Sequence, residues 1–279
     1  MSEPDLPIPV LDNHMHCDPK KGEGIDAVKK FERSGGTHLC MVNKPSWGYG
    51  IQASSGDDFR DVFDYSLSTA EDAREVVTDV FPVLGVHPGL ISNLVEWGKS
   101  VDEAEEIMKE GLEVAAEYVE EGEAVALKSG RPHYEVSDEI WEASNNVMEH
   151  AFRLGGEIDC AVQLHTEGAS QLEEITDTAE SVGMNPDRVV KHFAPPDLEG
   201  PVPSVLAKED QIRQAVEERD DRFMMETDYI DDPDRPGAVL GLRTVPRRVR
   251  SLIDDHEKVM YEANVETPEE IYGVEMSLD

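Results

Sequence analysis

Eight short apolar segments, rich in β-branched residues, alternate with longer acidic and amphipathic segments along the chain. An alternation of eight strands with helices is typical of a TIM-type (β/α)8 barrel. The alternative is an open, doubly wound sheet, but no glycine-rich phosphate turn follows the first predicted strand. We therefore expect one α/β barrel domain over residues 1–279. The predicted strands are Ile8–His14, His38–Asn43, Val80–Val86, Ala124–Lys128, Cys160–His165, Val189–His192, Val202–Ala207 and Phe223–Thr227.

The segments between these strands predict helices. Val101–Glu121 is an example, because its apolar residues recur every three or four positions and so share one helix face. Lys44–Ser66 is rich in Gly, Ser and aromatic residues, so we expect a long loop over the barrel mouth. Further helices are predicted at Glu139–Leu154, Gln171–Val182, Glu209–Arg219 and Val245–His256. Glycines at the expected helix C-termini are Gly35-Gly36, Gly122, Gly155-Gly156 and Gly183.

Metal-type side chains lie at or just after the ends of several predicted strands. Side chains alternate along a strand, so His14 and His16 share a face. A His-x-His pair alone is as typical of a surface or a core as of a metal site. Here His165, His192 and Asp228 follow at the ends of three later strands. The carboxyl ends of parallel barrel strands meet at one rim, so we predict that these five residues form a divalent-metal site.

Imidazole nitrogens and carboxylates suit one or two divalent ions, with Zn²⁺, Mn²⁺, Ni²⁺, Co²⁺ and Mg²⁺ as candidates. A catalytic ion keeps a position open for water and lowers its pKa to about 7. Asp228 could both bind the ion and accept the water's proton, which makes it the predicted catalytic residue. Glu226 shares its strand face and is expected either to orient a ligand or to form an ordinary ion pair. A metal-dependent hydrolase is the leading interpretation.

These motifs resemble the TatD family of metal-dependent hydrolases, which belongs to the amidohydrolase superfamily. The resemblance covers nearly the whole chain and rests on His14-x-His16, Gly85-Val86-His87-Pro88, His165, His192 and Glu226-Thr227-Asp228. Gly130–Tyr134 and Glu226–Asp232 resemble an archaeal branch of the family. The resemblance implies a TIM barrel, a site for one or two metal ions and hydrolysis of phosphoester bonds. Better-known members of the family are deoxyribonucleases.

Lys128 departs from the family pattern, which usually has a bridging Glu at the end of the fourth strand. Phosphotriesterase-like enzymes and dihydroorotases of the same superfamily use a carbamylated lysine there. One hypothesis is therefore a carbamylated Lys128 that bridges two ions, which would favour a small amide, lactone or phosphotriester as substrate. The other is a protonated Lys128 that repels a second ion and contacts a substrate anion. A barrel that binds metal or ligand without turnover is the third alternative.

Three further residues are predicted to contact the substrate. By resemblance His87 lies in the pocket, and a structural role in its loop is the alternative. Arg131 and His133 follow the fourth strand and could bind an anionic leaving group, unless their loop is held by salt bridges. Five arginines also follow the eighth strand, where barrels often bind phosphate: Arg235, Arg243, Arg247, Arg248 and Arg250. For Arg248 and Arg250 we favour a role in balancing the acidic surface.

The chain has a formal net charge of −36, from 61 acidic and 25 basic residues. Disorder fits poorly because apolar segments recur regularly, so we expect a folded protein with an acidic surface. Such a surface is tolerated where salt screens it, which indicates a haloadapted cytoplasm; an ordinary acidic protein is the alternative. We expect a small-molecule or phosphoester substrate; nucleic acid is a possible partner, but the charge does not support it because an acidic surface repels polyanions.

Location follows from cysteine usage and hydropathy. The chain has three cysteines, an odd number, and they are widely spaced: Cys17, Cys40 and Cys160. This pattern indicates reduced thiols in a cytosol. No apolar run approaches the length of a membrane span, and the N-terminus has no basic and then apolar signal. We expect a cytoplasmic protein without a membrane partner.

Overall fold

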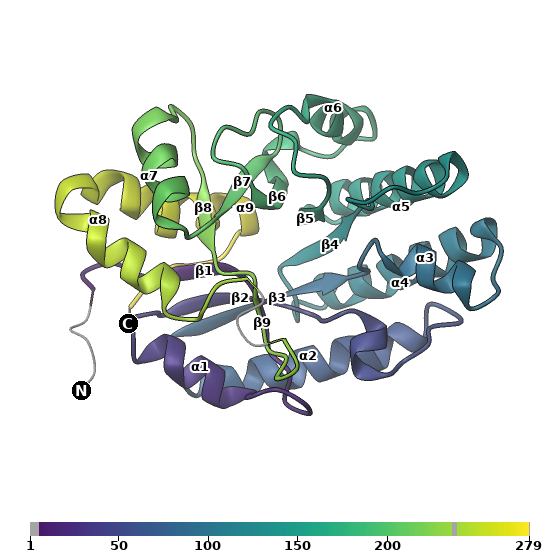
Figure 1. Cartoon of the computed structure of the whole chain (residues 1–279), viewed down its shortest axis with the longest axis horizontal. Coiled ribbons are helices and arrows are strands. Elements are labelled where there is room, and N and C mark those ends of the chain that lie inside the picture. The colour runs from purple at the N-terminus through teal and green to yellow at the C-terminus, as the bar shows by residue number, and fades with distance from the viewer. Residues whose placement is uncertain (1–5, 236–238, 279) are drawn as a thin grey trace.

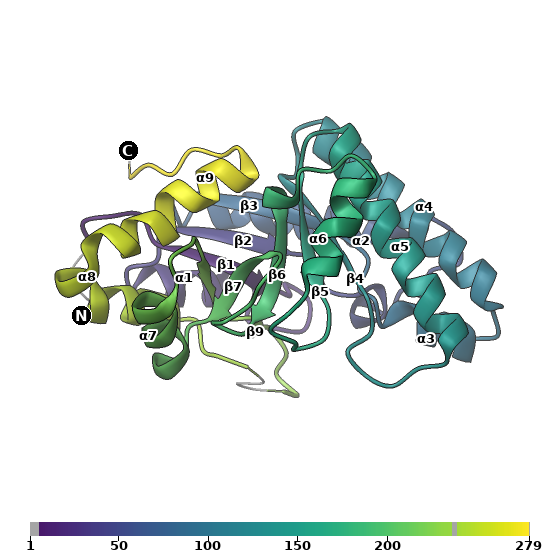
Figure 2. The ribbon, with the colours of Figure 1, turned by 90° about the horizontal axis from the view of Figure 1, so that it is seen from above.

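The computed structural model describes residues 6–235 and 239–278 (Figures 1 and 2). All eight predicted strands are present, with shifted bounds, and a short ninth strand follows the eighth. The strands are β1 Leu11–His16, β2 His38–Val42, β3 Asp79–Gly85, β4 Ala126–Gly130, β5 Ala161–His165, β6 Val189–Ala194, β7 Val202–Leu206, β8 Met224–Glu226 and β9 Tyr229–Ile230.

The strands form a single parallel sheet in the order β8-β7-β6-β5-β4-β3-β2-β1-β9. β8 and β9 lie at opposite ends of this order, yet only Thr227 and Asp228 separate them in the chain. The sheet therefore closes on itself, which confirms the TIM-type barrel. Asp228 has φ 45°, a left-handed conformation that interrupts the extended backbone and divides the last strand in two.

The predicted bounds of the first strand were wrong. Ile8–Val10 are buried but precede the strand, which continues through His16. Pairing with two neighbours holds the polar end of β1 extended: Met15 pairs with Met41 of β2 and with Tyr229 of β9. Both histidines of the His-x-His pair thus lie within the strand.

The predicted helices are confirmed, again with shifted bounds, and they surround the barrel (Figure 1). The α4 helix begins with a capping box, in which the Ser100 hydroxyl accepts from the Glu103 N–H and the Glu103 carboxylate from the Ser100 N–H. The α-helices are α1 Ile25–Glu32, α2 Asp58–Arg74, α3 Leu90–Glu96, α4 Val101–Glu120, α5 Asp138–Glu157, α6 Glu173–Ser181, α7 Glu209–Glu218, α8 Thr244–Tyr261 and α9 Thr267–Tyr272.

Two local predictions were wrong. Gly155-Gly156 do not end a helix but lie in the last turn of α5, where a side chain on Gly156 would meet the Gly183 carbonyl oxygen at 2.9 Å. These glycines therefore serve close packing. Lys44–Ser66 is not one loop, because Ser46–Tyr49 form a 3-10 helix and α2 begins at Asp58. The positive φ angles of Gly122 and Gly183, after α4 and α6, agree with the predicted helix ends.

The C-terminal segment closes the end of the barrel where the strands begin. Ile271 and Tyr272 of α9 join a buried cluster with the first residues of several strands, among them Leu11 and Ala126. Figure 2 shows α9 lying across this end. The opposite end, where the strands finish, carries the loops and the candidate site. Among the described residues no helix is long and apolar enough to cross a membrane.

Candidate metal centre

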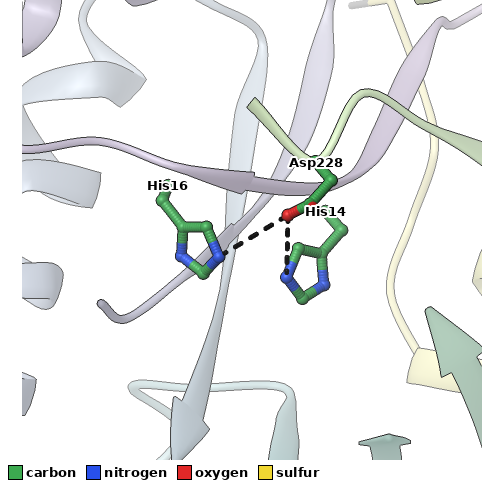
Figure 3. A group of neighbouring side chains, drawn as sticks. All are labelled: His14, His16 and Asp228. Carbon is green, nitrogen blue, oxygen red and sulfur yellow. Dashed lines mark ion pairs between the residues drawn. The ribbon is translucent and has the colours of Figure 1, made fainter. Parts of the chain in front are cut away.

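The predicted metal ligands converge at the end of the barrel where the strands finish. His14 and His16 come from β1, His165 from β5 and His192 from β6, and Asp228 follows β8. The Nε2 atoms of His14 and His16 each lie 3.9 Å from Oδ1 of Asp228 (Figure 3). Potential ligand atoms of these three residues lie within 4.8 Å of one another. Such a cluster can share one ion.

Hydrogen bonds set the tautomers of the two β1 histidines. Nδ1 of His14 lies 2.8 Å from Oε1 of Gln163, and Nδ1 of His16 lies 2.8 Å from the carbonyl oxygen of Val42. Both oxygens only accept, so each Nδ1 carries the proton and each Nε2 keeps its lone pair. Burial, followed by the nearby charge of Lys128, lowers the pKa of both imidazoles well below the usual range. Neutral rings with lone pairs facing a carboxylate fit a divalent ion.

A polar network inside the barrel orients Gln163. Its amide nitrogen donates to the Asn13 carbonyl oxygen at 3.1 Å and to the Tyr272 hydroxyl at 2.8 Å, which leaves Oε1 for His14. The Tyr272 hydroxyl in turn donates to Oδ1 of Asn13 at 2.9 Å. Sequence reasoning missed this network. Gln163 precedes His165 by two positions, so strand alternation could have placed it on the same face.

Glu226 orients the opposite side of the site. Its Oε1 lies 3.3 Å from Nδ1 of His192 and accepts the Phe193 N–H at 2.8 Å, while Oε2 accepts the Ser204 hydroxyl. His14, His192 and Glu226 also lie close enough to hold an ion. Both oxygens of Glu226 are already engaged, one by the Phe193 N–H and the other by the Ser204 hydroxyl, which disfavours that grouping. The contacts favour the prediction that Glu226 orients a ligand over an isolated ion pair.

Two histidines from neighbouring strands face each other beside the first cluster. Nδ1 of His165 lies 2.7 Å from Nε2 of His192, so one of these nitrogens donates a hydrogen bond to the other, and an ion bound there would take the place of the shared proton. The ring of His192 stacks on that of His14 with 4.0 Å between centroids. Burial is the main cause that lowers the pKa of His165 and of His192 well below the usual range. The pair could hold a second ion next to the first.

Lys128 of β4 lies beside the first cluster, next to His14. It is only 3% exposed, and its Nζ lies 3.1 Å from Nε2 of His14. Burial lowers the pKa of the amine to about 8, with Asp228 and Glu226 acting in the opposite direction. The amine therefore competes for the lone pair that His14 would offer to an ion. A metal ion can bind Nε2 of His14 only if Lys128 moves or changes its chemical state.

Asp12 fixes the turn that carries Asp228. This fully buried carboxylate accepts the N–H of Thr227 at 2.9 Å and its hydroxyl at 2.6 Å. The next residue is Asp228, whose left-handed backbone turns its carboxylate toward the histidines. Sequence reasoning missed Asp12 as well, although it precedes His14 by two positions on the same strand face.

A cavity of about 440 Å³ opens beside these residues. His87 lines it, and its Nδ1 accepts the Gly89 N–H at 3.0 Å, so Nε2 carries the proton and can donate to a ligand. Trp47 also lines the cavity and packs edge-on against His87, with 5.6 Å between ring centroids. Lysine and arginine side chains complete part of the wall: Lys21, Lys44, Lys128 and Arg235.

Arg131 and His133 lie outside the residues that line this cavity. The Arg131 guanidinium bonds to Glu167 at 2.9 Å and to Glu174 at 2.9 Å. This engagement favours the salt-bridged-loop alternative for Arg131. Nδ1 of the exposed His133 lies 2.9 Å from Nε2 of His165, so His133 contacts the site from its outer side.

Comparisons with known proteins identify the family and the fold. The family model described as TatD related DNase matches residues 11–273. An uncharacterized protein of Methanocaldococcus jannaschii is 36% identical over 284 residues, which cover 97% of this chain and 98% of the relative. Two solved structures share the fold at 13% identity. The organophosphorus hydrolase from Deinococcus radiodurans has a TM-score of 0.57, with 95% and 92% of the two chains covered. An amidohydrolase from Mycoplasma synoviae has a TM-score of 0.61, with 95% and 88% covered.

Proposed function

The chain belongs to the TatD-related DNase family and is a hydrolase, and we propose that it hydrolyses a phosphoester with one or two divalent metal ions. The observation that carries the proposal is the approach of His14 Nε2, His16 Nε2 and Asp228 Oδ1 at the open end of the barrel. The tautomers and the burial of the two histidines prepare them as metal ligands.

In this proposal the residues divide into three roles. His14, His16 and Asp228 would hold the first ion, and His165 and His192 would hold a second ion where two are bound. When bound, a divalent ion acidifies water and polarises the ester. The second oxygen of Asp228 would accept the proton of the attacking water. The Nε2–H of His87 would donate a hydrogen bond to a phosphoryl oxygen.

The charges around the cavity support an anionic substrate. In a chain whose net charge is −36, Lys21, Lys44 and Arg235 form a cationic cluster in the cavity wall beside Asp232 and Asp234, and within it Lys44 is already paired with Asp18 at 2.7 Å. A phosphoryl group would be attracted to this local cluster, whereas a long nucleic acid would also meet the acidic surface. We therefore propose a short phosphodiester as the substrate class and treat DNA as the alternative within the same chemistry.

Lys128 supports a second candidate function. A carbamate on Nζ, which lies 3.1 Å from Nε2 of His14, would place a carboxylate-like group beside the first cluster. Carbamylated lysines belong to enzymes that act on small amides, lactones or phosphotriesters, so the same site could serve that chemistry. A barrel that binds metal without turnover is the third candidate.

A substrate screen separates these candidates. The protein is stripped with a chelator and reloaded with Mn²⁺, Zn²⁺, Co²⁺ or Ni²⁺. It is then assayed in molar KCl against bis(p-nitrophenyl) phosphate, diethyl p-nitrophenyl phosphate, a lactone and DNA. We expect metal-dependent release of nitrophenolate from the diester, at least about 100-fold above the stripped protein. Preference for the triester or the lactone would support the second candidate. Metal binding without any turnover would support the third.

We also propose that the acidic surface is adapted to a salt-rich cytoplasm. At molar salt the Debye length falls to about 3 Å, so repulsion among surface carboxylates is screened. We expect the melting temperature to rise by about 10 °C between dilute buffer and molar KCl. Scanning calorimetry measures it, with sucrose as a control for solute exclusion. Equal stability in dilute buffer and in molar KCl would contradict the proposal.

A further inference from the structure

A second cavity, of about 470 Å³, adjoins the candidate metal centre. The two cavities share Lys21, Ile230 and Asp232 in their walls. Ile230 of β9 pairs in register with His16 of β1, so this second cavity begins next to a proposed metal ligand. A molecule bound in the first cavity could therefore extend into the second.

The charge balance of the chain is reversed at this second cavity. Four cationic side chains line it against three carboxylates, whereas the whole chain has 25 basic and 61 acidic residues. Such a local reversal on an acidic protein indicates a site that receives an anion. The cations are Lys21, Lys30, Arg243 and Arg247, and the carboxylates are Glu23, Asp231 and Asp232.

Two of the three carboxylates already have partners. Asp231 is 1% exposed and accepts the backbone N–H groups of Asp18, Glu23 and Gly24 at 2.7–2.9 Å. Glu23 pairs with Lys30. Their negative charges are therefore largely compensated within the protein and oppose an incoming anion only weakly.

Two cations, in contrast, keep their charge available. Nζ of Lys21 donates to the Gly48 carbonyl oxygen at 3.0 Å, a partner that carries no formal charge. Arg243 is exposed, and within residues 6–235 and 239–278 no carboxylate pairs with it. Lys21 lies in the walls of both cavities, and Arg243 lies in the wall of the second. Together they can bind an anion that extends from the first cavity into the second.

The start of α8 adds to the positive potential. Gly241, Leu242 and Thr244 line the cavity where this helix begins, and its first turn contains no acidic residue. The dipole of the helix favours an anion at this end, although the Thr244 N–H is already bonded to the Gly241 carbonyl oxygen and Pro246 has no N–H. Arg248, further along the same helix, is directed instead to Glu209, 3.6 Å away. The arginines after the last strand thus divide between the cavity and the outer surface.

We propose that this second cavity binds a phosphate group of the substrate other than the one that is cleaved. The proposal rests on the proposed phosphodiesterase function and narrows its substrate class to short phosphodiesters with a further phosphate. The scissile group would lie at the metal centre, and the additional phosphate would contact Lys21 and Arg243 beside the start of α8.

The test compares two esters that differ only in the additional phosphate: the p-nitrophenyl ester of thymidine 5′-phosphate, with and without a 3′-phosphate. The metal-loaded protein is assayed at the lowest KCl concentration at which it stays folded, because salt screens the contact. We expect the 3′-phosphate to lower KM about tenfold with kcat unchanged. Arg243→Gln should remove this advantage. Arg248→Gln, on the same helix but outside the cavity, should retain it.

Calorimetric titration of inorganic pyrophosphate into the metal-free protein supplies a readout independent of turnover. We expect Arg243→Gln, but not Arg248→Gln, to weaken this binding about tenfold. If neither ester is hydrolysed, the phosphodiesterase proposal fails while the titration still tests the cavity. Equal KM values for both esters, an advantage that persists in Arg243→Gln, or unchanged pyrophosphate binding in that variant would each overturn the cavity proposal.

Discussion

Asp228→Asn will lower kcat/KM of the metal-loaded protein by at least about a thousandfold, a loss of about 4 kcal/mol of transition-state stabilisation. Oδ1 of Asp228 lies 3.9 Å from each of the two β1 histidines, so this carboxylate is the anionic member of the cluster. An asparagine of nearly the same size keeps the turn after β8 but removes the negative charge and the proton acceptor. Steady-state kinetics in saturating metal measures the loss.

Asp234→Asn is the matched control, because Asp234 lines the same cavity but belongs to neither candidate metal cluster. We expect this variant to change kcat/KM less than about threefold. His14→Ala should lose activity as Asp228→Asn does and should also lower bound metal, measured by elemental analysis. Retained turnover in both Asp228→Asn and His14→Ala would remove the metal mechanism.

Lys128→Met will lower kcat about 100-fold and reduce bound metal from two ions per chain to one, if Lys128 is the bridge. The neutral amine attacks the carbon of CO2, a C–N bond forms, and the nitrogen loses a proton to solvent, leaving a carbamate anion. Methionine has similar length but cannot form this anion. Lys128→Glu supplies a carboxylate directly and should retain two ions. Elemental analysis and kinetics measure both variants.

Intact mass measured under CO2 tests the carbamate itself. The adduct should be present in the native protein, absent in Lys128→Met and retained in Lys191→Met. Lys191 is the suitable control, since it is also buried, burial likewise lowers its pKa to about 8, and its Nζ bonds to the His192 carbonyl oxygen. Two bound ions beside an unmodified Lys128 amine would contradict the bridge. One ion in the native protein and two in Lys128→Glu would support the protonated-lysine alternative.

The sequence was sufficient to predict the barrel and the neighbourhood of the site. Strand alternation and apolar content are local properties, so eight strands could be recognised from segments such as His38–Asn43 and Val202–Ala207. Parallel strands in a barrel finish at the same rim, so residues near those ends, such as His165 and Asp228, could be expected to meet. No contact between distant residues had to be known.

Element boundaries depended on contacts that the sequence does not display. Pairing of Met15 with both β2 and β9 extends the first strand to His16, and Gly155-Gly156 stay helical because α5 packs closely on the turn at Gly183. The divided last strand likewise follows from Asp12 of the neighbouring strand β1, which holds Thr227 through two hydrogen bonds. In each case a long-range interaction overrides a local preference.

The chemical state of the site was decided only in the tertiary structure. The sequence by itself determined which side chains, such as His14 and Asp228, reach the open rim, because strand period and strand order are encoded locally. It did not determine the tautomer of His14, which depends on Gln163 and, through it, on Tyr272 near the other end of the chain. It also did not distinguish Arg131, engaged by two glutamates, from Arg243, which faces a cavity. Hydrogen bonding and burial arise only when distant segments are packed together, and they control proton positions and available charge.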